Sequence, residues 1–341
     1  MASFSFLGRV FVILALLCTS IAGHAVPLDF GSLDKRQSTN LVGYFGIFFK
    51  GNDQRVYFYL SNGNDPCSFR PLNGDRPVLS ANGGTGGVRD MSIVVGDGNE
   101  KGRKWFMLGT DLDITKTDFN RATRTGSLSM FIWESSDLVN WGGERLIKVE
   151  EDIGGMLWAP EGIWSSSKGK YFVFWSAKLY PKNDPNHQAN GIKSVIRGSY
   201  TSDFNNFDPP FTYLDANPMS VIDMSILHLG GNTYVRLIKN EADNSVFSEI
   251  STGGLDGQWS RKGVIEKEVE GPAPYLDNQV KGKGHLLLDF FGRGGYRAYE
   301  SDDIPSGQWR KSCSGFPGGL RHGFVVPVDQ RQYDGLSQRY R

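Results

Sequence analysis

The feature that most constrains the fold is a short pattern that recurs five times along the 341-residue chain. In each copy an apolar segment leads to a small hydroxyl residue, then to an acidic or Asn-containing turn, and finally to an aromatic residue. The aromatic residues are spaced by 72, 66, 52 and 50 residues and are Phe69, Trp141, Phe207, Trp259 and Trp309. Such spacings are typical of four-stranded propeller blades with insertions. The repeat therefore predicts five structural units, each with this turn before its outer strand.

The rest of the chain reads as short antiparallel strands. Alternating aromatic-rich segments run from Tyr44 to Phe324, and Gly, Asn, Asp or Pro separates them. The 43 Gly and 15 Pro fit a chain of strands and turns, and no sustained helical period appears. We expect an all-β fold, a five-bladed β-propeller, with a β-sandwich as the alternative. The innermost strands, which would line a central channel, are expected to begin near Tyr44, Asp90, Trp158, Asp223 and Glu270, and a last strand after residues 321–323 would close the ring.

The first residues carry targeting features. Residues 1–25 read as a secretory signal peptide, because Arg9 precedes an apolar run that is too short to span a bilayer. Residues 26–36 read as a propeptide that ends in a dibasic cleavage site, which leaves residues 37–341 as a single propeller domain. We expect a secreted, extracellular monomer.

The charge of the chain excludes some partner classes. The sequence has 37 basic and 37 acidic residues and no basic run of the kind that marks a nucleic-acid or membrane partner. A neutral polymer or a small neutral substrate is the expected ligand.

Two cysteines, Cys67 and Cys313, would remain after Cys18 leaves with the signal peptide. Secretion permits a disulfide between them, which would join the two ends of a closed ring. Two separate buried thiols fit the sequence equally well, because connectivity cannot be read from sequence.

Three carboxylates stand where a turn meets an apolar strand. Asp90 and Asp223 share the local sequence Asp-Met-Ser-Ile, and Glu270 begins Glu-Gly-Pro. Glycoside hydrolysis needs one carboxylic acid to protonate the leaving oxygen and one carboxylate to activate water or attack the anomeric carbon. A third acid nearby can raise the pKa of the proton donor. Taken singly, each of these residues also fits a strand cap, a buried acid or a solvated surface group.

The chain contains an ordered set of motifs: Gly-Val-Arg-Asp (87–90), Trp-Glu-Ser-Ser-Asp-Leu-Val-Asn-Trp (133–141), Trp-Ala-Pro-Glu (158–161), Phe-Trp-Ser-Ala-Lys-Leu-Tyr (174–180), Ser-Val-Ile-Asp (220–223) and Glu-Gly-Pro (270–272). In their order and spacing they resemble glycoside hydrolase family 43, whose fold is a five-bladed β-propeller. The resemblance covers essentially the whole chain after the N-terminal segment. It is closest to the branch of secreted exo-acting α-1,5-L-arabinofuranosidases.

The resemblance implies a role for each carboxylate. Asp90 matches the family's general base, Asp223 the acid that modulates pKa and orientation, and Glu270 the general acid. The family inverts anomeric configuration, which implies carboxylates of Asp90 and Glu270 about 6.5–9.5 Å apart, with room for a water. Two positions depart from the pattern. Met91 stands where many relatives have Pro, and Glu161 stands where most of the wider family has Asp.

Five further residues are candidates for contact with substrate: Arg89, Trp158, Glu161, Asp289 and Arg293. Trp158 offers an apolar face for a sugar ring, and Arg89 could keep the neighbouring base ionised. The alternatives are a Trp158 in the core between blades and an Arg89 that packs across a blade.

One residue is a candidate for ion binding. By the resemblance, His322 matches the position where the family often holds a central structural ion such as calcium, usually through waters. A hydrogen-bonded core histidine is the alternative. The sequence indicates no redox or nucleotide cofactor, and the expected reaction requires none.

The function that the resemblance implies is release of L-arabinose from the α-1,5-linked arabinan of plant cell walls, or from arabino-oligosaccharides. An endo-arabinanase or a β-xylosidase could use the same three acids, and a non-catalytic sugar-binding propeller is a further alternative. Exo action would need one end of the site to be blocked, which segments 115–126 and 180–191 could do.

Overall fold

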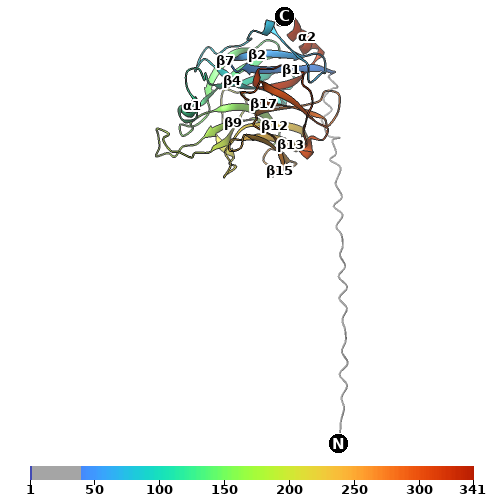
Figure 1. Ribbon diagram of the computed structural model, residues 1–341. Helices are drawn as coiled ribbons and strands as arrows, with labels where there is room; N and C mark the ends of the chain where they lie inside the picture. The colour runs from blue at the N-terminus through green and yellow to red at the C-terminus, as the bar shows by residue number, and fades with distance from the viewer. Residues whose placement is uncertain (2–39) are drawn as a thin grey trace.

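The computed structural model describes Met1 and residues 40–341. The predicted propeptide and all of the predicted signal peptide except Met1 lie outside the described residues. The described chain forms five four-stranded antiparallel sheets (Figure 1). The expectation of an all-β, five-bladed β-propeller is therefore confirmed.

Each blade consists of four strands, named in order from the innermost to the outermost. Blade 1 contains β20 (Leu320–Asp329), β1 (Leu41–Lys50), β2 (Asp53–Ser61) and β3 (Phe69–Pro71). Blade 2 contains β4 (Val88–Val95), β5 (Trp105–Asp111), β6 (Ser129–Ser135) and β7 (Gly142–Lys148). Blade 3 contains β8 (Trp158–Ser165), β9 (Lys170–Lys178), β10 (Ser194–Thr201) and β11 (Phe211–Leu214). Blade 4 contains β12 (Val221–Gly230), β13 (Thr233–Asn240), β14 (Ser245–Ser251) and β15 (Ser260–Lys267). Blade 5 contains β16 (Glu270–Leu276), β17 (Gly284–Phe290), β18 (Gly295–Ser301) and β19 (Arg310–Lys311).

The innermost strands contact one another in the ring order β20, β4, β8, β12, β16. Four of them begin where the sequence predicts. The expectation of an inner strand near Tyr44 is wrong, because β1 is the second strand of blade 1 and β20 pairs along its inner edge. Both ends of the propeller chain thus share one sheet, which closes the ring through backbone hydrogen bonds.

The repeated turn joins the third and fourth strands of every blade, as predicted. Its local chemistry is clearest in blade 2. There the Ser135 hydroxyl donates to Asp137, whose Oδ1 accepts from the backbone amides of Val139 and Asn140 at 2.9 and 2.7 Å. In this blade the repeated pattern predicts Ser136 as the hydroxyl residue of the turn. The hydroxyl that bonds Asp137 is instead that of Ser135, the last residue of the strand.

The aromatic residue that ends each turn packs into a hydrophobic cluster between two blades. Among the described residues there are five large clusters, each shared by neighbouring blades. Trp141 of blade 2 packs against the cluster shared with blade 1, and Phe207 of blade 3 against the cluster shared with blade 2. The repeat thus marks the contact of each blade with the one before it.

Two short α-helices interrupt the β-structure, which the sequence did not predict. They are α1 (Phe119–Thr125) and α2 (Gln330–Arg339), with single 3-10 turns at Asn73–Asp75, Gly98–Glu100 and Ile304–Ser306. Helix α2 begins with a capping box between Asp329 and Gln332, but only Leu336 in it is buried. A single buried residue leaves no apolar stripe, so a periodicity search misses the helix.

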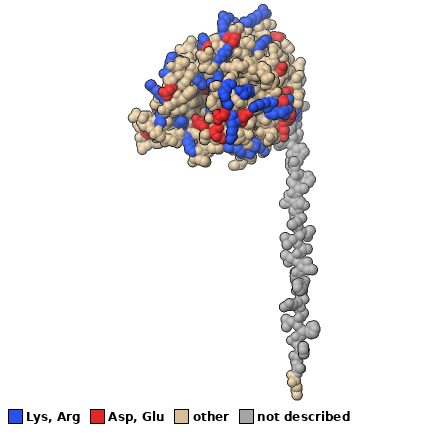
Figure 2. Space-filling view, in the orientation of Figure 1, with Lys and Arg blue, Asp and Glu red and all other residues tan. Residues whose placement is uncertain are grey.

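Acidic and basic side chains are mixed on the surface (Figure 2). Figure 2 shows Lys and Arg side chains interspersed with Asp and Glu on the face in view. Within the described residues, no helix is both long and apolar enough to cross a bilayer.

Candidate active site

The inner strands share a local distortion near their first residues. In β4, β8, β12 and β16 the pairing register shifts there, which marks a β-bulge. The residue inside each bulge has a φ of 48–53° and is Asp90 (49°), Ala159 (48°), Asp223 (50°) and Gly271 (53°). Positive φ is uncommon for residues other than Gly, and such backbone clusters at functional sites. The bulges therefore re-aim side chains at one end of the ring, which we call the strand-start face.

The three predicted carboxylates lie on this face. Asp90 and Asp223 occupy the positive-φ position of β4 and β12, and Glu270 directly precedes that position in β16. All three belong to the starts of inner strands in different blades. The fold therefore brings together residues that are separated by up to 180 positions in the sequence.

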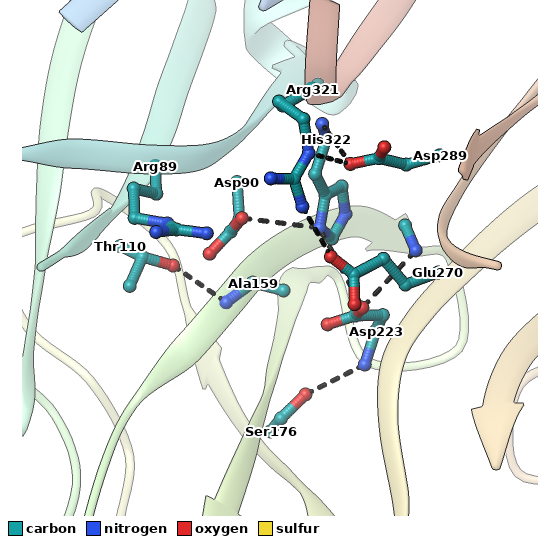
Figure 3. Close-up of polar contacts among 12 residues, drawn as sticks. Arg89, Asp90, Thr110, Ala159, Ser176, Asp223, Glu270, Asp289, Arg321 and His322 are labelled. Carbon is teal, nitrogen blue, oxygen red and sulfur yellow. Dashed lines mark hydrogen bonds and ion pairs between the residues drawn. The ribbon is translucent and has the colours of Figure 1, made fainter. Parts of the chain in front are cut away.

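His322, at the bulge of β20, joins two of the carboxylates (Figure 3). Its Nδ1 lies 3.4 Å from Oδ1 of Asp90 and 4.0 Å from Oδ2 of Asp223. Burial lowers the pKa of His322, but the negative charges of Asp223, Asp90 and Glu161 outweigh burial and raise it to about 9. His322 is therefore an imidazolium cation at neutral pH.

Asp90 is held in its ionised form. Burial raises its pKa, but the hydrogen bond and charge of His322, with the charge of Arg89, bring the net pKa below its ordinary value. Asp223 differs, because burial and the charge of Glu270 raise its pKa to about 6, in spite of the cations His322 and Lys239. The site thus contains two aspartates with different proton affinities.

Hydrogen bonds fix the position of Asp223. Its Oδ2 accepts from the backbone amide of Gly271 at 3.3 Å, and its own amide donates to the Ser176 hydroxyl at 3.0 Å. Because Gly271 follows Glu270 directly, the side chain of Asp223 is tied to the strand that carries Glu270.

Two cations hold Glu270. Nζ of Lys239 lies 2.7 Å from its Oε2, and Nη2 of Arg321 lies 2.7 Å from its Oε1. Arg321 also places Nε 2.5 Å from Oδ2 of Asp289, a fully buried carboxylate. Burial raises the pKa of Asp289, and the charge of Arg321 offsets only part of that rise.

Sequence reasoning missed Lys239 and Arg321 as partners of Glu270. Arg321 had one available signal, since it precedes His322 as Arg89 precedes Asp90, at the same bulge position of an inner strand. Lys239 lies at the end of β13 and had none, because only the packing of blade 4 against blade 5 brings it to Glu270.

Two of the other predicted residues, Arg89 and Trp158, both contact Phe119. Arg89 is buried, with its guanidinium over the rings of Phe49 at 4.7 Å and Phe119 at 5.7 Å. Its Nη1 donates to Gln54 at 3.5 Å, and its buried Nε has no hydrogen-bond partner within the described part of the chain. Trp158 is half-buried and meets Phe119 edge to face.

Of the three remaining predicted substrate contacts, two are buried and one is exposed on a turn. Asp289 is buried behind Arg321, and Glu161 is buried with its Oε2 accepting from the Ser225 hydroxyl at 3.0 Å. Burial raises the pKa of Glu161 to about 8, although His322 and Ser225 lower it. Arg293 is exposed in the turn between β17 and β18, where it contacts the Glu268 carbonyl and the Phe290 ring.

The residues around His322 do not fit a directly bound metal ion. Among the described residues, no group of three or more His, Cys, Asp or Glu side chains has the arrangement of a metal site. A protonated imidazole has no free lone pair for a metal, and Nδ1 already faces two carboxylates.

We expect the stability of the protein to fall as the pH rises. A charged His322 stabilises the fold fully below its unfolded pKa of about 6.5, and this contribution is lost as the pH rises through about 9. The neutral Glu161 acts in the same direction between its ordinary pKa and about 8. Urea unfolding should show a loss of about 3 kcal/mol between pH 6.5 and 9.5 from His322. The imidazole NMR signals of His322 check its charge directly and should show the protonated ring at pH 7.5. A neutral imidazole at that pH would contradict a charged His322.

Comparison with known proteins identifies the family of the chain. A family model described as "Probable glycosyl hydrolase domain", related to glycoside hydrolase family 43, matches residues 39–334. The curated α-L-arabinofuranosidase of Bifidobacterium longum subsp. longum is 29% identical over 228 residues, which are 62% of this chain and 21% of that protein. The chain therefore spans about a fifth of the length of this relative.

Solved structures are similar in fold at low sequence identity. A family 43 β-1,3-galactosidase has a TM-score of 0.50 at 14% identity, over 86% of this chain and 58% of that one. The endo-arabinase of Bacteroides thetaiotaomicron VPI-5482 has a TM-score of 0.47 at 14% identity, over 71% of this chain and 94% of that one. Because the family model spans nearly the whole propeller, the chain belongs to the glycosyl hydrolase domains related to glycoside hydrolase family 43.

Proposed function

We propose that this chain is an exo-acting α-L-arabinofuranosidase that releases L-arabinose from α-1,5-linked arabinan and arabino-oligosaccharides. The observation that carries the proposal is the convergence of three carboxylates, Asp90, Asp223 and Glu270, from three blades around the cation His322. The 29% identity with an α-L-arabinofuranosidase supports the choice of sugar.

In this proposal Asp90 is the general base. It is ionised beside His322 and Arg89, so its carboxylate can accept a proton from a water molecule. The water oxygen attacks the anomeric carbon, and the bond from that carbon to the glycosidic oxygen breaks with inversion. His322 holds Asp90 in place and is a positioning residue.

Glu270 is the general acid and gives its proton to the departing oxygen. Both of its oxygens accept from cations, Lys239 and Arg321, so a protonated Glu270 must give up one of these contacts. We infer that the substrate displaces one cation when it binds. Asp223, whose pKa is near 6, lies beside Glu270 through the Gly271 amide and would modulate the proton affinity of the acid.

Secretion is part of the proposal. The signal-like residues 1–25 and the dibasic Lys35-Arg36 support a protein that is exported and cleaved. N-terminal sequencing of protein recovered from the culture medium checks this, and the expected first residue is Gln37.

The test is a time course on linear α-1,5-arabinan, with products separated by size. We expect arabinose alone from the earliest time points. A ladder of oligosaccharides would identify an endo-arabinanase, and activity only on xylo-oligosaccharides would identify a β-xylosidase. Binding of arabinan without any product would favour a sugar-binding propeller.

A further inference from the structure

The connections on the strand-start face differ in length around the ring. On this face each blade has one hairpin connection, between its second and third strands counted from the axis. The connection is long in blade 2 (residues 112–128) and in blade 3 (residues 179–193), with 17 and 15 residues. The corresponding connections of blades 1, 4 and 5 have 2, 4 and 4 residues and are residues 51–52, 241–244 and 291–294. Asp90 therefore belongs to a blade with a long connection and Glu270 to a blade with a short one, and we call these the high side and the low side of the face.

Arg124, in α1, ties the two long connections together. Its Nη1 donates to the carbonyls of His187 and Ala189 at 2.8 and 2.9 Å, and its Nη2 donates to Asn190 at 2.8 Å. The ring of His187 in turn stacks on Tyr180 at 4.3 Å. Three directed hydrogen bonds from one guanidinium make these two connections a single unit, which we call the end wall (residues 112–128 and 179–193).

Phe119 is the part of the end wall that borders the candidate active site. Its side chain is 53% exposed, although it meets the edge of Trp158 at 6.1 Å and covers the guanidinium of Arg89 at 5.7 Å. Arg89, under this ring, is buried and precedes Asp90 directly, so Phe119 lies next to the strand start that carries Asp90. An exposed aromatic face next to a carboxylate is the chemistry that recognises a sugar ring with its hydroxyls.

We propose that the end wall closes one side of the sugar site, with Phe119 against the terminal furanose ring and the rest of the chain leaving over blades 4, 5 and 1. The proposal rests on the proposed function and adds to it the direction in which the arabinan chain leaves the site. The departing oxygen then lies on the low side, where Glu270 can protonate it. The water-activating Asp90 lies beside the wall, where only one sugar fits.

The test compares two wall variants with two matched controls. Arg124→Ala should release oligosaccharides as well as arabinose from linear α-1,5-arabinan, because the three hydrogen bonds of the guanidinium between the two connections are lost. The contact of the His187 ring with the Arg124 backbone carbonyl remains and holds the connections less firmly. Phe119→Ala should raise the KM for arabinotriose about tenfold, equivalent to about 1.4 kcal/mol, with little change in kcat. Phe119→Trp should restore most of the affinity.

The two control variants replace a Phe and an Arg that lie outside the end wall. Phe211 is an exposed aromatic on the outer strand of blade 3, and Arg145 lies on the outer strand of blade 2, where its Nη2 donates to Glu134 at 2.6 Å. Phe211→Ala and Arg145→Ala should both match the wild type. If wild-type protein and every variant release arabinose alone with an unchanged KM, the wall is refuted while the proposed function stands. If the wild type does not cleave arabinan, the proposed function itself fails.

Discussion

Glu270→Gln should lower kcat on arabinotriose by about 10²–10⁴-fold, because glutamine cannot give a proton to the departing sugar oxygen. On 4-nitrophenyl α-L-arabinofuranoside the loss should be far smaller, since nitrophenolate leaves without protonation. Gln also keeps the size of the side chain and an acceptor oxygen for Lys239 or Arg321. The comparison of the two substrates therefore isolates proton donation from any effect on folding.

The matched variant is Asp90→Asn, which should lose activity on both substrates to a similar degree. A base activates the water whatever the leaving group is. Glu144→Gln is the control, since Glu144 lies on the outer strand β7 and accepts hydrogen bonds from Asn82 at the surface. Full activity of Glu270→Gln on arabinotriose would exclude Glu270 as the acid, and equal losses on both substrates would assign it another role.

Replacing Cys67 and Cys313 together by Ser should lower the free energy of unfolding by about 4 kcal/mol. The structure joins these residues by a disulfide across a sequence separation of 246. Cys67 lies before the outer strand of blade 1, and Cys313 follows the outer strand of blade 5. The bridge thus closes the ring at its rim, and its loss frees a long loop in the unfolded chain.

Urea unfolding of the double variant, of the wild type and of the wild type with reductant measures this effect. The reduced wild type should unfold at the same urea concentration as the double variant. A double variant within about 1 kcal/mol of the oxidised wild type would show that the bridge adds little to ring closure. Both cysteines are replaced together because a single replacement leaves a reactive thiol.

The repeat in the sequence predicted the number of blades and the place of each turn because that chemistry is local. A carboxylate such as Asp137 accepts from amides two and three residues later, and the aromatic residue follows at once. Residues this close in sequence leave a readable pattern. The sequence could not identify the inner strand of blade 1, since β1 and β20 are both apolar and only their pairing decides which lies nearer the axis.

The identity of the three carboxylates could also be predicted, because each follows its own turn and motif. The ion-pair partners and pKa values of these carboxylates could not be predicted from the sequence. Lys239 and Arg321 reach Glu270 from β13 and β20, 31 and 51 residues away, and Asp289 behind them depends on burial. The pKa of His322 likewise depends on carboxylates from other strands, Asp90 and Asp223, and the ion expected near it stays a prediction.

The sequence by itself therefore determined that the fold is all-β, how many blades it has, where each repeated turn lies, and which acids stand at the strand starts. Alternation along a strand and turn chemistry both act over a few residues. Only the tertiary structure decided which strand closes the ring, that the two cysteines meet, and which cation faces which acid. Those outcomes depend on distances between blades, and the pKa values of Asp90, Asp223 and His322 follow from burial and charge at those distances.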